Sequence, residues 1–206
     1  MVRNKYIILV FVFVTINLDS ATNFRTDSKF VLCDMDTEKK INIEEFLYIN
    51  ASIESKHVPN VANKNGCFGL YQMNKYSLTE IGFSEKKLNK MFRSIRYNDD
   101  KKIYLFDTTH FGVTEQRKRI EEYLFLVETH YLRKSINTFV GRKRGGVRIT
   151  KAGILSASFL GYLNVAKYLA SNGKINYRDG NGQTIKDRLM VFSNKEVEKE
   201  FLYSLF

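Results

Sequence analysis

An acidic residue at the expected end of a helix is the strongest candidate for chemistry in this chain. Glu54 is followed directly by Ser55, and eleven residues later a Gly-punctuated segment, residues 66–73, carries Tyr71 and Gln72. A carboxyl group beside hydroxyl and amide groups can protonate a glycosidic oxygen, provided that its pKa is high enough for it to keep a proton near neutral pH. We therefore expect Glu54 to act as a general acid.

The residues before Glu54 predict the helix that positions it. Residues 41–54 have a helical pattern, with Asn42 as a candidate N-cap. Phe46 and Leu47 lie on the apolar stripe of this helix, and Glu54 falls on the same stripe. Burial and the C-terminal end of the helix dipole would both disfavour the charged carboxylate. The alternative is a frayed helix end with Glu54 in solvent.

The rest of the chain predicts a mainly α-helical single domain over residues 22–206, with residues 22–40 irregular. Strand signals are weak, so we expect at most a small β-ribbon between Pro59 and Gln72. There is one proline and no Gly- or Ser-rich linker, which argues against a second domain. Further helical patterns cover residues 75–81, 85–95, 114–139, a pair within 150–171 that breaks at Gly161, and 184–192 and 194–205.

The first 21 residues have the composition of a secretory signal peptide. Arg3 and Lys5 precede a short apolar run over residues 6–14, and polar and small residues follow as far as Ala21. The run is short for a membrane span of about 20 apolar residues, although an uncleaved anchor is the alternative. We expect residues 1–21 to be removed, and the protein to be periplasmic or secreted with no stable membrane insertion.

The chain is strongly basic, with a formal net charge of +11. Such a charge favours acidic polymers, among them nucleic acid, anionic lipid and the carboxylate-bearing bacterial wall. Because an exported protein seldom meets nucleic acid, we expect a wall polymer as the partner and no nucleic acid. The alternative is a lysine-rich surface that only keeps the protein solvated.

Cys33 and Cys67 are the only cysteines, and an oxidising compartment would allow a disulfide between them. Such a bridge would tie the N-terminal segment to the loop that follows Glu54. A cysteine peptidase that uses Cys67 with His57 or His110 is an alternative, but no local signature supports it. No metal-ligand spacing or cofactor motif occurs, so we expect no metal and no cofactor.

Three motifs, taken in order, resemble the lysozyme-like soluble lytic transglycosylases, and in particular a secreted and phage-encoded subgroup. The resemblance covers roughly residues 45–192 and implies a lysozyme-like α+β domain with a small or absent β-ribbon. The motifs are Glu54-Ser55, then Gly-x-x-Gly-Leu-Tyr-Gln over residues 66–72, then the run from Gly146 to Leu155 with Asn164-Val165 and the turn at residues 179–182.

The resemblance implies cleavage of peptidoglycan glycan strands between N-acetylmuramic acid and N-acetylglucosamine. In a lytic transglycosylase, Glu54 would act as acid and then as base, closing a 1,6-anhydro ring without water. A muramidase would need a second carboxylate, for which Asp107 is the nearest candidate and has no local signature. The substrate-binding residues that the resemblance implies are Ser55, Gly69, Tyr71, Gln72, Ser158 and Phe159.

The sequence departs from the family pattern at two points. Tyr71 stands where the family commonly has Met, and residues 157–159, Ala-Ser-Phe, replace the Ala-Tyr-Asn or Ala-His-Leu of relatives. Ser158 can replace a hydrogen bond of that Tyr or His, but not its ring. A non-catalytic alternative therefore stays open, in which the chain only binds peptidoglycan or serves a secretion apparatus. A protein inhibitor or a secretion partner would fit either interpretation.

Overall fold

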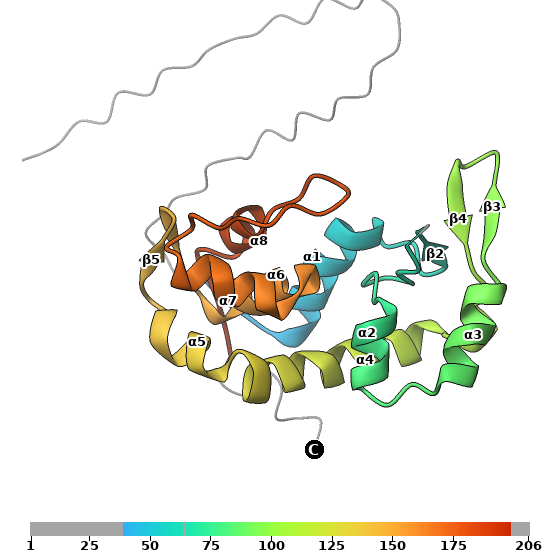
Figure 1. Ribbon diagram of the computed structural model, residues 1–206, viewed down its shortest axis with the longest axis horizontal. Coiled ribbons are helices and arrows are strands. Elements are labelled where there is room, and N and C mark those ends of the chain that lie inside the picture. The colour runs from blue at the N-terminus through green and yellow to red at the C-terminus, as the bar shows by residue number, and fades with distance from the viewer. Residues whose placement is uncertain (1–38, 64, 199–206) are drawn as a thin grey trace, which may run out of the picture. The chain divides into compact units, whose positions relative to one another are not determined.

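The computed structural model describes residues 39–63 and 65–198 (Figure 1). The predicted signal peptide, Cys33 and the end of the last predicted helix lie outside this part. Within it the fold is mainly helical with small sheets, as the sequence predicts. No helix among the described residues is long and apolar enough to cross a membrane.

Helix α1, Ile43–Ser55, begins where the sequence predicts. Asn42 caps it, because its side-chain oxygen accepts a hydrogen bond from the backbone amide of Glu45 at 2.9 Å. The apolar stripe faces inward, and Phe46 is fully buried. The helix ends at Lys56, whose left-handed backbone (φ 52°) lets its amide bond back to the last carbonyls. The helix is therefore ordered to its last turn, and the frayed alternative is wrong.

The predicted helix over residues 114–139 is present but interrupted. A π-helical turn, η2, occupies Val127–Tyr131 and separates two α-helices. The wider turn changes the angular position of the residues that follow it. Tyr131, the last residue of this turn, is 38% exposed, whereas Leu124 on the preceding helix is buried. The helices between residues 75 and 139 are α2 (Lys75–Glu80), α3 (Glu85–Arg93), α4 (Val113–Leu126) and α5 (Arg133–Phe139), with a 3₁₀ turn, η1, at Thr108–His110.

The C-terminal helices lie together above α5 in Figure 1. The predicted break at Gly161 is confirmed, and its φ of 98° is a conformation that glycine adopts without strain. Helix α6 packs against both α7 and α8, and its residues 152–157 are all buried. The elements are α6 (Lys151–Ala157), the 3₁₀ turn η3 (Ser158–Leu160), α7 (Tyr162–Ala170) and α8 (Ile185–Val191).

The largest sheet differs from the predicted ribbon. Strand β2, Val61–Ala62, lies in the predicted region but pairs with β4, Ile103–Leu105, which in turn pairs with β3, Arg96–Asn98. The β3–β4 hairpin projects beyond α3 (Figure 1). Its strands are three residues each, too short to give a clear alternating pattern in the sequence.

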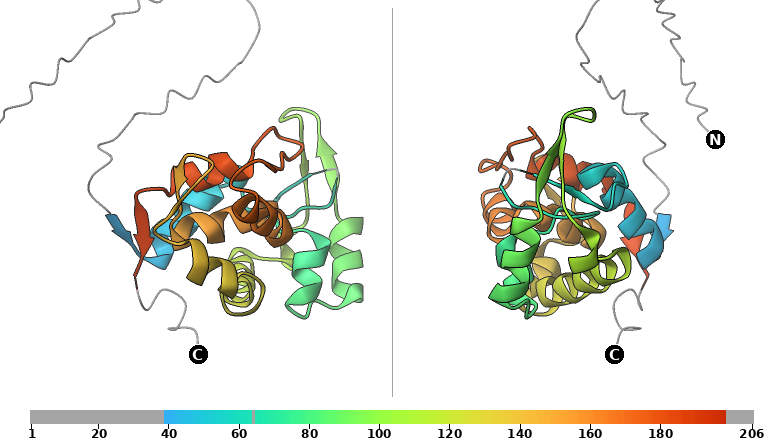
Figure 2. Two further views of the ribbon diagram at one scale, coloured as in Figure 1. Left: turned by 60° about the vertical axis from the view of Figure 1, so that its left-hand side comes forward. Right: turned by 90° about the vertical axis from the view of Figure 1, so that its right-hand side faces the viewer.

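Two further pairs of strands correct the sequence-based expectations. Lys195–Val197 forms β7, not the start of a helix, and pairs in parallel with β1, Lys39–Ile41 (Figure 2). This long-range pairing overrides the local helical pattern of residues 194–205. The basic loop after α5 contains a hairpin of β5, Lys143–Arg144, and β6, Val147–Arg148.

Candidate active site

Glu54 lies in the last turn of α1, and its side chain is largely buried, with 12% of it exposed. Its Oε1 atom accepts a hydrogen bond from Nη2 of Arg188, on α8, whose side chain is only 2% exposed. Within the described part of the chain, Oε2 accepts no hydrogen bond. Among the residues that the structure describes, the carboxyl group is therefore held through Oε1 alone, on the inward face of the helix.

Arg188 belongs to a buried polar network that joins α1, α6 and α8. Its Nη1 atom lies 3.5 Å from Oδ1 of Asn50, which also accepts a 2.6 Å hydrogen bond from the hydroxyl of Ser156. The side-chain amide of Asn50 donates to the carbonyl of Phe46 at 2.8 Å. Sequence reasoning missed Arg188. The sequence feature that could have identified it is a charged residue between Ile185 and Leu189, on the inward face of the same helix.

The electrostatic environment of Glu54 favours its protonated form. Burial raises the pKa of the carboxyl group, because removal from water destabilises the charged carboxylate more than the neutral carboxyl group. The cation of Arg188 acts in the opposite direction, and the negative charge of Asp179 adds a smaller increase. The net direction is upward. Glu54 thus keeps its proton at higher pH than a solvated glutamate.

Asp179 is the second carboxylate close to Glu54, and sequence reasoning did not assign it that position. It lies in the predicted turn before α8, where its Oδ1 accepts from the backbone amides of Asn181 at 2.9 Å and Gln183 at 2.8 Å. Asp107, the residue considered from sequence, instead caps the 3₁₀ turn η1.

Cys67 is half-buried near the same carboxylates. Burial raises the pKa of its thiol, and the charges of Glu54 and Asp179 raise it further, against a hydrogen bond with Asn63. A cysteine nucleophile needs a lowered pKa, so this environment argues against the cysteine-peptidase alternative. Because Cys33 lies outside the described residues, the disulfide stays a prediction.

The loop that follows β2 is fixed by a buried glutamine that sequence reasoning also missed. Gln116, on α4, accepts a hydrogen bond from the backbone amide of Leu70 at 2.7 Å. Its own amide donates to the carbonyls of Pro59 and Phe111, both at 2.8 Å. Gly69 has φ +76°, and a side chain there would collide with this glutamine. The glycine of the second motif is therefore required by the loop itself, and no substrate contact is needed to explain it.

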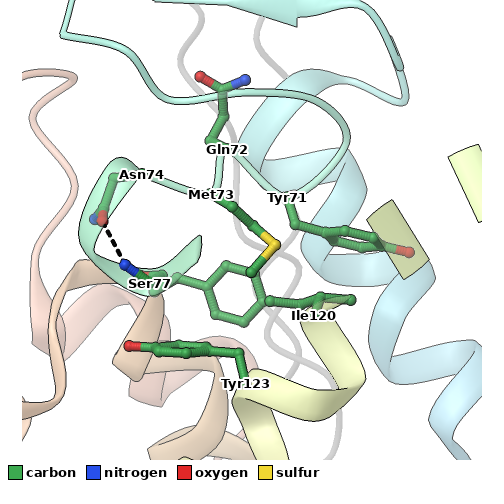
Figure 3. Close-up of a pocket in the computed structure, with 8 residues that line it drawn as sticks. Tyr71, Gln72, Met73, Asn74, Ser77, Ile120 and Tyr123 are labelled. Carbon is green, nitrogen blue, oxygen red and sulfur yellow. Dashed lines mark hydrogen bonds between the residues drawn. The ribbon is translucent and has the colours of Figure 1, made fainter. Parts of the chain in front are cut away.

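Figure 3 shows a pocket beside the second sequence motif, with Tyr71 and Gln72 among the residues that line it. Its cavity volume is about 10 Å³, room for about one water molecule, so a sugar ring does not fit without side-chain movement. Gln72 lies at its edge and donates to the carbonyl of Gly69 at 3.0 Å. The lining residues are Tyr71, Gln72, Met73, Asn74, Ser77, Ile120, Tyr123 and Phe159.

Three of the predicted substrate-binding side chains are occupied by the protein itself. Tyr71 is a core residue with 6% exposure, so little of its ring is open for stacking on a sugar. The same burial raises the pKa of its hydroxyl to about 12. The hydroxyl of Ser55 donates to the carbonyl of Ala51 at 3.1 Å. The hydroxyl of Ser158 donates to the carbonyl of Leu155 at 2.6 Å.

No group of three or more His, Cys, Asp or Glu side chains within the described ranges could hold a metal ion. A scan against protein-family models finds no match for this chain, and searches of curated proteins and of solved structures find none either.

Proposed function

We propose that the protein cleaves peptidoglycan glycan strands, with Glu54 as the general acid of a lysozyme-like domain. The observation that carries this proposal is the buried carboxyl group of Glu54, held through one oxygen and with its pKa raised by burial. A general acid at a glycosidic bond needs both a retained proton and a fixed direction. The strongly basic chain favours an acidic wall polymer as substrate.

The proposed reaction begins when Glu54 protonates the oxygen between N-acetylmuramic acid and N-acetylglucosamine. The bond from that oxygen to C1 of N-acetylmuramic acid breaks, and the N-acetylglucosamine end leaves. The Glu54 carboxylate then accepts the proton of the 6-hydroxyl group as its oxygen bonds to C1, which closes a 1,6-anhydro ring without water. This lytic transglycosylase outcome needs no second catalytic carboxylate. Asp179 uses Oδ1 to hold two backbone amides, so we assign it an electrostatic effect on Glu54 and not the role of a nucleophile.

We propose that Gln72 and Phe159 bind substrate, which requires the pocket that they line to open for a sugar ring. Both line the small pocket between the loop after β2 and the start of η3. We propose that the protein acts in the periplasm or outside the cell, as the predicted signal peptide and a peptidoglycan substrate would require.

A non-catalytic peptidoglycan-binding or secretion-apparatus protein is the second candidate function. The ion pair between Glu54 and Arg188 favours it, since such a pair can also serve only to join α1 to α8. The small volume of the pocket beside Gln72 favours it too.

Release of dye-labelled fragments from purified sacculi separates the two candidates. The wild type is expected to bind sacculi and release soluble dye, whereas Glu54→Gln is expected to bind without release. Glu45→Gln is the matched control, because Glu45 lies on the same helix in a solvent-exposed pair with Lys39 and should leave release unchanged. A wild type that binds but releases nothing would favour the non-catalytic candidate.

A further inference from the structure

Arg188 is a charged side chain in a position that the fold alone would fill with an apolar residue. It lies on α8 between Ile185 and Leu189, which are both buried in the core. Buried ion pairs often contribute little net stability, because removing both charges from water offsets their attraction. Stabilisation of the fold alone is therefore a weak explanation for a charged side chain at this position.

The contacts of Arg188 fix the direction of its guanidinium group. Nη2 donates to Oε1 of Glu54, and Nη1 lies 3.5 Å from Oδ1 of Asn50. Asn50 is itself held at both ends of its amide, by the hydroxyl of Ser156 at 2.6 Å and the carbonyl of Phe46 at 2.8 Å. The planar group thus spans Oε1 of Glu54 and the anchored Oδ1 of Asn50, which is a geometry that a lysine ammonium does not reproduce.

We propose that Arg188 is a positioning residue that holds Oε1 of Glu54, so that the transferable proton resides on Oε2 alone. An arginine carries only donors and does not lose its proton, so an oxygen that accepts from it stays unprotonated. The last torsion of a free glutamate side chain is broad and allows either oxygen to face a substrate. The bond from Arg188 selects one orientation. This inference rests on the proposed function.

The titratable and charged groups that face Glu54 come from two other elements besides α8. They are Asp179, in the turn before that helix, and the thiol of Cys67, in the loop after β2. Arg188 is the only cation among the interactions that shift the pKa of Glu54 within the described residues. Lys186, two residues earlier on α8, points to the opposite side of the helix.

The test compares Arg188→Met and Arg188→Lys with the control Lys186→Met, in rates of sacculus solubilisation over a pH series. In Arg188→Met we expect kcat to fall by about 100-fold, the loss typical of a misplaced catalytic group. The high-pH limb of its profile should move to higher pH, because the cation that opposes the raised pKa is gone. Arg188→Lys keeps the charge, so its limb should stay in place while its rate remains below that of the wild type.

Asn50→Asp keeps the test decisive if Arg188→Met does not fold. This nearly isosteric change offers the guanidinium a competing carboxylate, and we expect a lower rate with the high-pH limb again displaced upward. Circular dichroism verifies the folding of every variant. A folded Arg188→Met or Asn50→Asp protein with the wild-type rate and an unchanged limb would overturn the positioning role.

Failure of the proposed function would look different from failure of this inference. A wild type without activity, or an active Glu54→Gln variant, would refute the glycan-cleaving function itself. An active wild type and an inactive Glu54→Gln variant, with the profile of Arg188→Met unchanged, would refute only the role of Arg188.

Discussion

The buried guanidinium of Arg188, on α8, donates a hydrogen bond to the carboxyl group of Glu54, in the last turn of α1. Two opposite effects meet in this pair. Burial raises the pKa of Glu54, whereas the adjacent cation lowers it, and burial is the larger effect. The balance between these effects sets the pKa of Glu54 and so decides whether this residue can serve as an acid. That pKa can be measured without any substrate.

The stability of the protein should depend on pH through Glu54. Because its folded pKa lies above the ordinary value of 4.5, the folded state binds more protons than the unfolded state between these two pKa values. The contribution of the neutral carboxyl is present below the unfolded pKa and is lost as pH rises through the folded pKa. The Tm of the wild type should therefore fall relative to that of Glu54→Gln as pH rises. A relative increase would mean that Arg188 dominates and that the carboxyl group is ionised.

Asp179→Asn should lower the pKa of Glu54, because the replaced charge is one of the effects that raise it. Asparagine keeps an oxygen for the backbone amides of Asn181 and Gln183, so the turn should stay folded. The carboxyl carbon signal of Glu54 in NMR, assigned by its loss in Glu54→Gln, gives this pKa directly. Asp99→Asn, in the turn between β3 and β4, is the control and should leave the signal unchanged. An unchanged titration in Asp179→Asn would contradict the proximity of the two carboxylates.

Gly69→Ala should destabilise the protein by more than its backbone conformation alone explains. A left-handed conformation costs a non-glycine residue about 1–2 kcal/mol, and a Cβ at this position would also collide with Gln116. Gly82→Ala isolates the first effect, because Gly82 has φ +82° and open space around its Cβ position. Urea denaturation of both variants measures the difference. Equal losses would show that the loop can move away from Gln116.

Gln116→Met should also lower the free energy of unfolding. It removes the partner of the Leu70 amide and of two carbonyls, at Pro59 and Phe111. Each buried group left without a partner costs about 1–3 kcal/mol, so a loss of several kcal/mol is expected in urea denaturation. Lys118→Met, an exposed position on the same helix, should stay close to the wild type. A loss below about 1 kcal/mol for Gln116→Met would contradict the structural role of this residue.

Local signals explain what the sequence predicted well. The cap at Asn42, the periodicity of α1 and the break at Gly161 each depend on residues close together in the chain, and all three are confirmed. The inward position of Glu54 follows from the same periodicity. Phe159 and Gln72, which lie far apart in the chain, line one small pocket.

Long-range contacts explain what the sequence did not predict. The partner of Glu54 lies on α8, and nothing near either residue in the chain indicates that they meet. The parallel pairing of β1 with β7 likewise depends on two distant segments, so a local pattern predicted a helix at residues 194–205. Ser55 and Ser158 were expected to bind substrate because of their motifs, but hydroxyl groups inside helices also bond to their own backbone.

Mass spectrometry of the soluble products from purified sacculi tests the central claim most directly. We predict that the wild type releases disaccharide peptides with 1,6-anhydro ends and that a folded Glu54→Gln variant releases none. Products with reducing ends would keep Glu54 as the acid but replace the transglycosylase outcome with hydrolysis. Intact glycan strands after incubation with folded wild-type protein would contradict the account.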